Sequence, residues 1–132
     1  RAAFGQLPLD GQFMKYLNIL LCVLMVLFAA VQYNDPDGLF WAVLYLIPAV
    51  WAGLAAFRLD TISTNVPTAL LLGSVVAGAI GVVYFWPTAP GFWRMEVWWE
   101  TETAREGIGV AIAVMVLIVA LATVWWQRGK AT

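Results

Sequence analysis

The sequence has no histidine, and Cys22 is the one cysteine among its 132 residues. The lack of histidine excludes bis-imidazole haem ligation, imidazole-bound zinc and acid–base catalysis by imidazole. A single cysteine excludes a disulfide within the chain and a thiolate cluster. Phosphate loops, nucleotide fingerprints and hydrolase elbows are also missing from the sequence. We therefore assign no catalytic residue, cofactor-binding residue or metal ligand, and we expect no cofactor and no nucleic-acid partner.

Charge is scarce as well: 11% of the residues are charged and 63% are hydrophobic, whereas soluble domains carry about 25% charged residues. Uncharged residues fill four runs: 16–34, 38–57, 61–93 and 107–127. A helix needs about 20 apolar residues to cross the hydrocarbon core of a membrane. Pro67 and the cluster Pro87, Pro90 and Gly91 shorten the third run to one crossing. The sequence thus predicts an all-α, integral membrane four-helix bundle with helices at about 15–33, 39–57, 67–85 and 107–127.

This pattern divides the chain into an N-terminal extension (1–13), a four-span transmembrane domain (14–127) and a tail (128–132). The first span is expected to be retained, because its apolar stretch is longer than the core of about 7–15 residues in a signal peptide. Apart from Lys15 at the start of the first helix, the spans contain no Asp, Glu, Lys or Arg. Proton relays and ion pathways use such residues, so a proton-coupled pump is not expected.

Basic residues predominate at one end of the predicted spans, against Asp10 and Asp60, and acidic residues predominate at the other. One end holds both termini and the loop between the second and third helices, with five basic residues: Arg1, Lys15, Arg58, Arg128 and Lys130. The other end holds two basic residues, Arg94 and Arg105, and six acidic ones. Lys and Arg collect on the cytoplasmic side of membranes. We therefore expect cytoplasmic termini and tail, with the protein in the plasma membrane, or in the inner membrane if the chain is bacterial.

Small residues at four-residue spacing mark the faces through which the helices are expected to pack. They are Gly73, Ala77 and Gly81 with the neighbouring Ser74 and Gly78, Ala49–Gly53 and Ala52–Ala56, and Gly109–Ala113. Pro48 lies inside the second predicted helix, where it removes a backbone donor and is expected to produce a kink.

Two polar segments at the acidic end explain the starts of two helices. Asp35 is predicted to cap the second helix, with Pro36 at its first position. Thr103 and Glu106 have the spacing of a capping box at the start of the fourth helix.

The same two segments are expected to converge, because both helices start at one membrane face. The candidate cluster comprises Asn34, Asp35, Asp37, Glu102, Arg105 and Glu106. Three interpretations remain open: an ion pair of Arg105 with Asp35 or Asp37 that locks the loops together, an acidic docking face for a basic partner, and an oxygen-ligand site for a cation such as calcium.

Aromatic residues surround this cluster and mark a candidate contact surface. Trp93, Trp98, Trp99 and Glu100 are the candidate partner or interface contacts. Apolar residues alternate with Arg94 and Glu96 between Phe92 and Trp99. The alternation predicts an extended strand lying on the membrane, and a short amphipathic helix fits it less well.

From about Met14 to Gln127 the chain resembles the transmembrane protein 220 family. The resemblance rests on the segment Gln32–Asp37 followed by Trp41 and the stretch Tyr45–Ala49, and on Arg105-Glu106-Gly107 before the last helix. It implies a small four-span membrane protein and supplies no activity.

Two functions follow from these features. The first is a non-catalytic accessory subunit or scaffold that associates with other membrane proteins through its acidic, aromatic loops. The alternative is a small-molecule or cation binding protein, or an enzyme, with its site at the outer mouth of the bundle. The alternative predicts a cavity under the two loops, lined by Asn34, Asp35, Asp37 and Arg105.

Overall fold

The computed structural model describes residues 11–131, and every regular element in that range is a helix. Four helices are long and apolar enough to cross a membrane, which confirms the prediction of four spans. They are α2 (Gly11–Ala30), α3 (Gly38–Phe57), α5 (Asn65–Tyr84) and α7 (Glu102–Ala131). Short elements connect them: the 3₁₀ turn η1 (Val31–Asn34), α4 (Leu59–Ile62) and α6 (Met95–Glu100).

The first and last helices extend beyond the apolar stretches that predicted them. α7 begins at Glu102 rather than near Gly107, because Glu, Ala and Arg favour the helical conformation in water as well as in lipid. α2 begins at Gly11, and the rest of the predicted extension lies outside the described residues.

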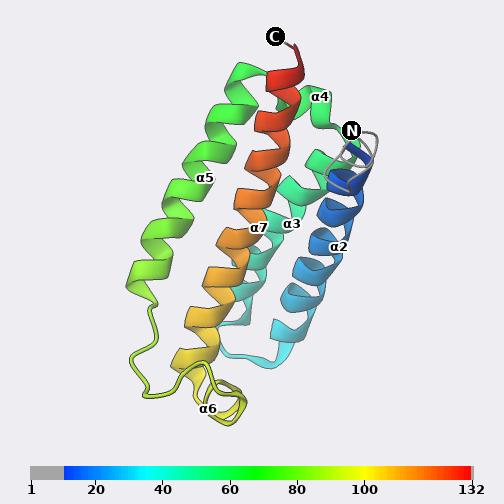
Figure 1. The fold of residues 1–132 in the computed structure, drawn as a ribbon. Helices are drawn as coiled ribbons and strands as arrows, with labels where there is room; N and C mark the ends of the chain where they lie inside the picture. The colour runs from blue at the N-terminus through cyan, green and yellow to red at the C-terminus, as the bar shows by residue number, and fades with distance from the viewer. Residues whose placement is uncertain (1–10, 132) are drawn as a thin grey trace, which may run out of the picture.

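The four spans are arranged around α7 rather than as a bundle of equivalent helices (Figure 1). α2 and α3 form an antiparallel hairpin that packs on one side of α7, and α5 packs on α7 from the other side. Burial follows this order, because 56% of the most apolar stretch of α7 is buried and only 6% of that of α5. α2 begins and α7 ends at the same end of the molecule, here named the terminal end, and α6 lies at the opposite end, named the mouth (Figure 1).

Small side chains allow α2 and α3 to approach closely. Met25 is fully buried on α2, and it belongs to the same core cluster as the buried Ala49 and Ala52 of α3. A Cβ at Gly53 would lie 3.6 Å from Cys22 Sγ. The predicted packing of the Ala49–Gly53 face against a helix of the same chain is therefore confirmed.

The contact of α5 with α7 uses only part of the predicted stripe of small residues. A Cβ at Gly78 would lie 2.6 Å from Val114 Cγ2, and one at Gly81 would lie 3.5 Å from Val110 Cγ1. A Cβ at Gly73 would meet nothing within 4 Å, and Ala77 is exposed. The predicted stripe is thus confirmed at Gly78 and Gly81 and wrong at Gly73 and Ala77, because α5 turns its Gly78 side toward α7.

An apolar groove remains between α3 and α5, which are not packed against each other along their length. It has a volume of about 240 Å³, and side chains of α7 form part of its lining. Pro48 is buried in the middle of α3 and lines this groove.

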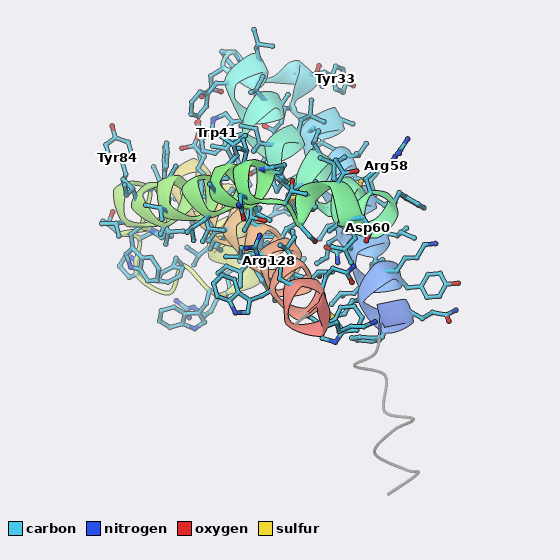
Figure 2. All side chains as sticks on the ribbon, turned by 90° about the horizontal axis from the view of Figure 1, so that it is seen from above. Tyr33, Trp41, Arg58, Asp60, Tyr84 and Arg128 are labelled. Carbon is cyan, nitrogen blue, oxygen red and sulfur yellow. The ribbon has the colours of Figure 1, made fainter. Side chains whose placement is uncertain are left out.

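Hydrogen bonds join the elements at the terminal end. Arg128 Nη1 on α7 donates to the carbonyl of Ser63 at 2.7 Å, and its Nη2 donates to Asn65 Oδ1 at 3.3 Å. Gln127 Nε2 donates to Asp60 Oδ1 at 2.9 Å. Seen from above in Figure 2, Arg128 and Asp60 lie near each other, whereas the exposed side chains of Tyr33 and Tyr84 project outward from the helices. α7 is therefore bound to the turn that leads into α5.

Candidate functional site: the cavity at the mouth

The segment between α2 and α3 turns tightly at the mouth. The backbone amide of Asp35 donates to the carbonyl of Gln32 at 3.1 Å, and that of Gly38 donates to the carbonyl of Asp35 at 3.0 Å. A Cβ at Gly38 would collide with the carbonyl oxygen of Gln32, so glycine is required there. The turn places the side chains of this segment beside the start of α7.

Asp37, and not Asp35, is the residue that precedes α3, which corrects the predicted cap. Its carboxylate does not cap the backbone; instead Trp41 Nε1 donates to Asp37 Oδ2 at 3.0 Å. The physical reason is that a buried indole N–H needs an acceptor, and Asp37 lies one helical turn before it. The bond orients Trp41 at the mouth.

The capping box predicted for the last helix is also wrong. Thr103 lies inside α7, and the amide of Arg105 donates to the carbonyl of Thr101 at 3.1 Å. Because the helix starts at Glu102, both Thr103 and Glu106 already belong to its first two turns. Their spacing is that of two residues on neighbouring turns.

The segment predicted as an extended strand contains a helix, α6, over Met95–Glu100. The apolar alternation is real, but an isolated strand at a membrane surface leaves its amide groups without partners, whereas a helix satisfies its own. Arg105 Nη1 donates to the carbonyl of Trp99 at 2.6 Å. The guanidinium therefore connects α7 to α6 in this structure, and its predicted ion pair with Asp35 or Asp37 stays a prediction.

A cavity of about 830 Å³ lies among η1, α3, α6 and α7 at the mouth. Aromatic side chains provide much of its wall: Phe28, Trp41, Tyr45, Phe92, Trp93, Trp98 and Trp99. The polar lining consists of Gln32, Asp35, Glu102, Arg105 and Glu106. Further along α7 the lining is apolar, with Ile108 and Ile112. From Glu102 to Ile112 the helix rises by about 15 Å, so the cavity extends from the polar mouth into the span.

The charged residues at this mouth influence one another. Glu106 lies just before the uncharged stretch 107–127 of α7, which is the part that crosses the membrane. Removal from water raises the pKa of Glu106; the carboxylates of Glu102, Asp37 and Asp35 raise it further, while Arg105 lowers it. The two segments that the sequence analysis singled out therefore share one electrostatic environment.

Some residues of the candidate cluster line the cavity and others do not. Asp35, Glu102, Arg105 and Glu106 line the cavity, and so do Trp93, Trp98 and Trp99 of the candidate contact surface. Asn34, Asp37 and Glu100 are not among the lining residues. No three carboxylate, thiol or imidazole side chains of residues 11–131 lie close enough to hold a metal ion, so the geometry gives no support to the calcium interpretation.

Tyr45 is a further site residue. In the sequence it stood out only as part of the stretch Tyr45–Ala49, on which the resemblance to the family rests. It lies in α3 with 5% of its surface exposed, and it packs edge-on against Phe28 at 5.3 Å between ring centroids. Its hydroxyl lies so close to Gly109 that a Cβ there would collide with it. The hydroxyl makes no hydrogen bond to any other described residue, and Tyr45 lines the cavity. The sequence did offer a signal for Tyr45. A phenol inside an uncharged run is noteworthy, because a tyrosine hydroxyl within a helix bundle usually has a hydrogen-bond partner.

A second polar contact, at the terminal end, also escaped the sequence analysis. Asn18 Nδ2 on α2 donates to Thr123 Oγ1 on α7 at 2.8 Å and to the carbonyl of Met14 at 2.8 Å. Both side chains are buried. An amide within an apolar span was the signal, because such a side chain usually bonds to another helix.

Comparison with known proteins agrees with this architecture. Residues 24–122 match the family model described as transmembrane family 220, helix. No curated protein and no solved structure matches the chain. The match confirms the resemblance drawn from the segment around Asp35 and from the start of the last helix. With four apolar helices and a family match over most of its length, this chain is a multi-pass membrane protein that belongs to transmembrane family 220.

Proposed function

We propose that this protein is a membrane-embedded binding protein whose site is the cavity at the mouth, and that it takes a small amphipathic molecule. The observation that carries the proposal is the cavity itself. Its volume of about 830 Å³ falls in the range of roughly 300–1,000 Å³ that is usual for small-molecule sites. Its wall is largely aromatic and aliphatic with a few polar groups, which is the usual composition of such sites.

The distribution of polarity along the cavity supports an amphipathic ligand. Asp35, Glu102 and Glu106 lie toward the mouth, while Phe28 and Ile112 line it within the spans. A ligand with a polar head and an apolar tail would match both regions. A wholly polar ligand would leave the apolar wall of the cavity without an apolar group to cover it.

Quenching of tryptophan fluorescence in lipid nanodiscs provides the test. A saturated alkyl alcohol with bromine at its tail end should quench the cavity tryptophans in a saturable manner. Ile108→Phe should weaken this binding about tenfold by filling the cavity. Ile118→Phe changes a residue of the same helix that is 50% exposed and does not line the cavity, so it should bind normally. Equal binding by both variants, or quenching that never saturates, would remove the proposal.

A second function, an accessory subunit or scaffold, has a different observation in its favour. α5 leaves most of its apolar surface uncovered, and Trp93, Met95 and Trp99 are 69%, 66% and 64% exposed at the mouth. A partner membrane protein would cover such surfaces.

Purification in mild detergent tests this second function. A defined partner should co-purify with the native chain, and Glu100→Lys should weaken the association, since Glu100 lies outside the cavity lining. A chain that purifies alone from native membranes would argue against a stable complex.

A further inference from the structure

We infer that the ligand of the mouth cavity is an amphipathic amine, whose ammonium group is attracted by the carboxylates of Asp35, Glu102 and Glu106 along the wall and binds beside Glu106 and the hydroxyl of Tyr45. This inference rests on the proposed function, because it names the chemical class that the same cavity selects.

The balance of charge in the cavity favours a cation. Three carboxylates and one guanidinium line it. The guanidinium of Arg105 keeps its charge while its Nη1 donates to the carbonyl of Trp99, so the carboxylates outnumber it by two. The carboxylates therefore present excess negative charge to whatever enters, which attracts a positive group and repels an anion.

The aromatic wall adds a second attraction for the same charge. Trp41, Trp98 and Trp99 line the cavity together with the carboxylates. The faces of such rings attract ammonium groups, most strongly where water is excluded. A carboxylate or sulfate head would gain nothing from these faces.

Tyr45 distinguishes an amine from a quaternary ammonium. Only 5% of the surface of Tyr45 is exposed. Its hydroxyl has no hydrogen-bond partner among the described residues. An N–H of a protonated amine can donate to this oxygen, whereas a quaternary ammonium has no N–H to donate. An amine can thus make a hydrogen bond to this hydroxyl that a quaternary ammonium cannot make.

Glu106 makes the binding dependent on pH. Desolvation and the neighbouring Glu102, Asp37 and Asp35 raise its pKa, and Arg105 lowers it. Protonated Glu106 carries no charge for an ammonium, so affinity should rise as the pH increases through the pKa of Glu106. An alkylamine stays protonated over this range, because the pKa of a primary alkylamine such as the lysine side chain is about 10.4.

The experiment compares brominated probes of equal chain length in phosphatidylcholine nanodiscs: an alkylamine, its trimethylammonium analogue, the matching carboxylate and the matching alcohol. The amine is expected to bind about tenfold more tightly than the alcohol and the trimethylammonium probe, and the carboxylate most weakly. Glu102→Gln together with Glu106→Gln should reduce amine binding to the level of the alcohol and remove its pH dependence. Glu96→Gln, on the exposed surface of α6, is the matched control.

The outcomes separate the two proposals. Binding of the alcohol by the double variant shows that the cavity is still formed, so a selective loss of the amine supports the role of the carboxylates. An amine that binds no better than the alcohol overturns this inference and leaves the proposed function standing. If none of the probes binds saturably, the proposed function itself fails. A last arm replaces part of the lipid with phosphatidylethanolamine: competition with the amine identifies a lipid head group as the source of the amine, and an unchanged affinity identifies a free amine.

Discussion

At the residue scale, glycines allow the close helix contacts of this protein, and two of them differ sharply in their surroundings. Gly78 faces Val114 across the contact of α5 with α7, while Gly73 on the same helix has open space beside it. Lipid is as apolar as leucine, so close approach of the backbones has to provide much of the attraction between these helices.

Gly78→Leu should therefore destabilise the fold while Gly73→Leu should not. Overpacking of a tight contact costs about 1–3 kcal/mol. Thermal unfolding in detergent, followed by circular dichroism, measures the difference between the two variants. Equal midpoints would mean that α5 is not held to α7 through Gly78.

Asn18 and Thr123 form the buried polar contact at the other end. Thr123→Val removes the acceptor of Asn18 Nδ2 and should cost about 0.6–1.7 kcal/mol, the range of such bonds within membranes. Asn18→Leu should cost less, because it also removes Oδ1, for which the described residues offer no partner. Unfolding of both single variants and of the double variant gives the coupling energy. A coupling of zero would show that the bond contributes nothing.

At the element scale, α5 is the span that packs least against the rest of the described molecule. It packs on α7 and α4, and its start is connected to α7 by Arg128. By contrast, α2 and α3 bury large parts of each other. The attachment of α5 should therefore respond to changes that leave the α2–α3 hairpin intact.

Arg128→Ala should loosen the start of α5. The variant loses the bonds to the carbonyl of Ser63 and to Asn65 Oδ1, so amides in the first two turns of α5 should exchange hydrogen faster. Arg58→Ala, another exposed arginine near the terminal end, is the control. Mass spectrometry of the exchanged peptides compares the two, and unchanged exchange in Arg128→Ala would contradict the assigned role.

The elements also show which features the sequence could predict. Uncharged runs located all four spans, because crossing a membrane is a requirement of local composition. α6 was mistaken for a strand, because a period of two in Trp93, Met95, Val97 and Trp99 does not report whether backbone partners exist. The register of Gly78 depends on which face of α5 meets α7, and the cavity depends on where α6 packs against α7. Neither the register nor the cavity can be predicted from the sequence of one helix, because both depend on how two or more helices pack.

At the scale of the whole molecule, the mouth gathers residues from distant parts of the chain at one end. Asp35 precedes α3 and Glu102 begins α7, yet both line the same cavity. Asp60 lies at the terminal end with Arg128 (Figure 2). Four crossings and the excess of Lys and Arg at the terminal end predict that the mouth faces away from the cytoplasm.

Cysteine labelling tests this orientation in a Cys22→Ala background. Asp35→Cys and Glu102→Cys should react with a membrane-impermeant maleimide added outside intact cells, and Asp60→Cys should react only after permeabilisation. If Asp35→Cys and Glu102→Cys label from different sides, the four-crossing architecture is wrong. If both label only after permeabilisation, the architecture stands and the orientation is reversed.

The central position of α7 has a consequence for biosynthesis. The ribosome delivers α2, α3 and α5 to the membrane before α7 exists, and α7 is the helix on which both the hairpin and α5 pack. The hairpin can form as soon as α3 is inserted, but among the described elements α5 packs chiefly on the short α4 until α7 is made. Attachment of α5 therefore waits for α7, and a ribosome that stalls before α7 leaves α5 unattached in the lipid.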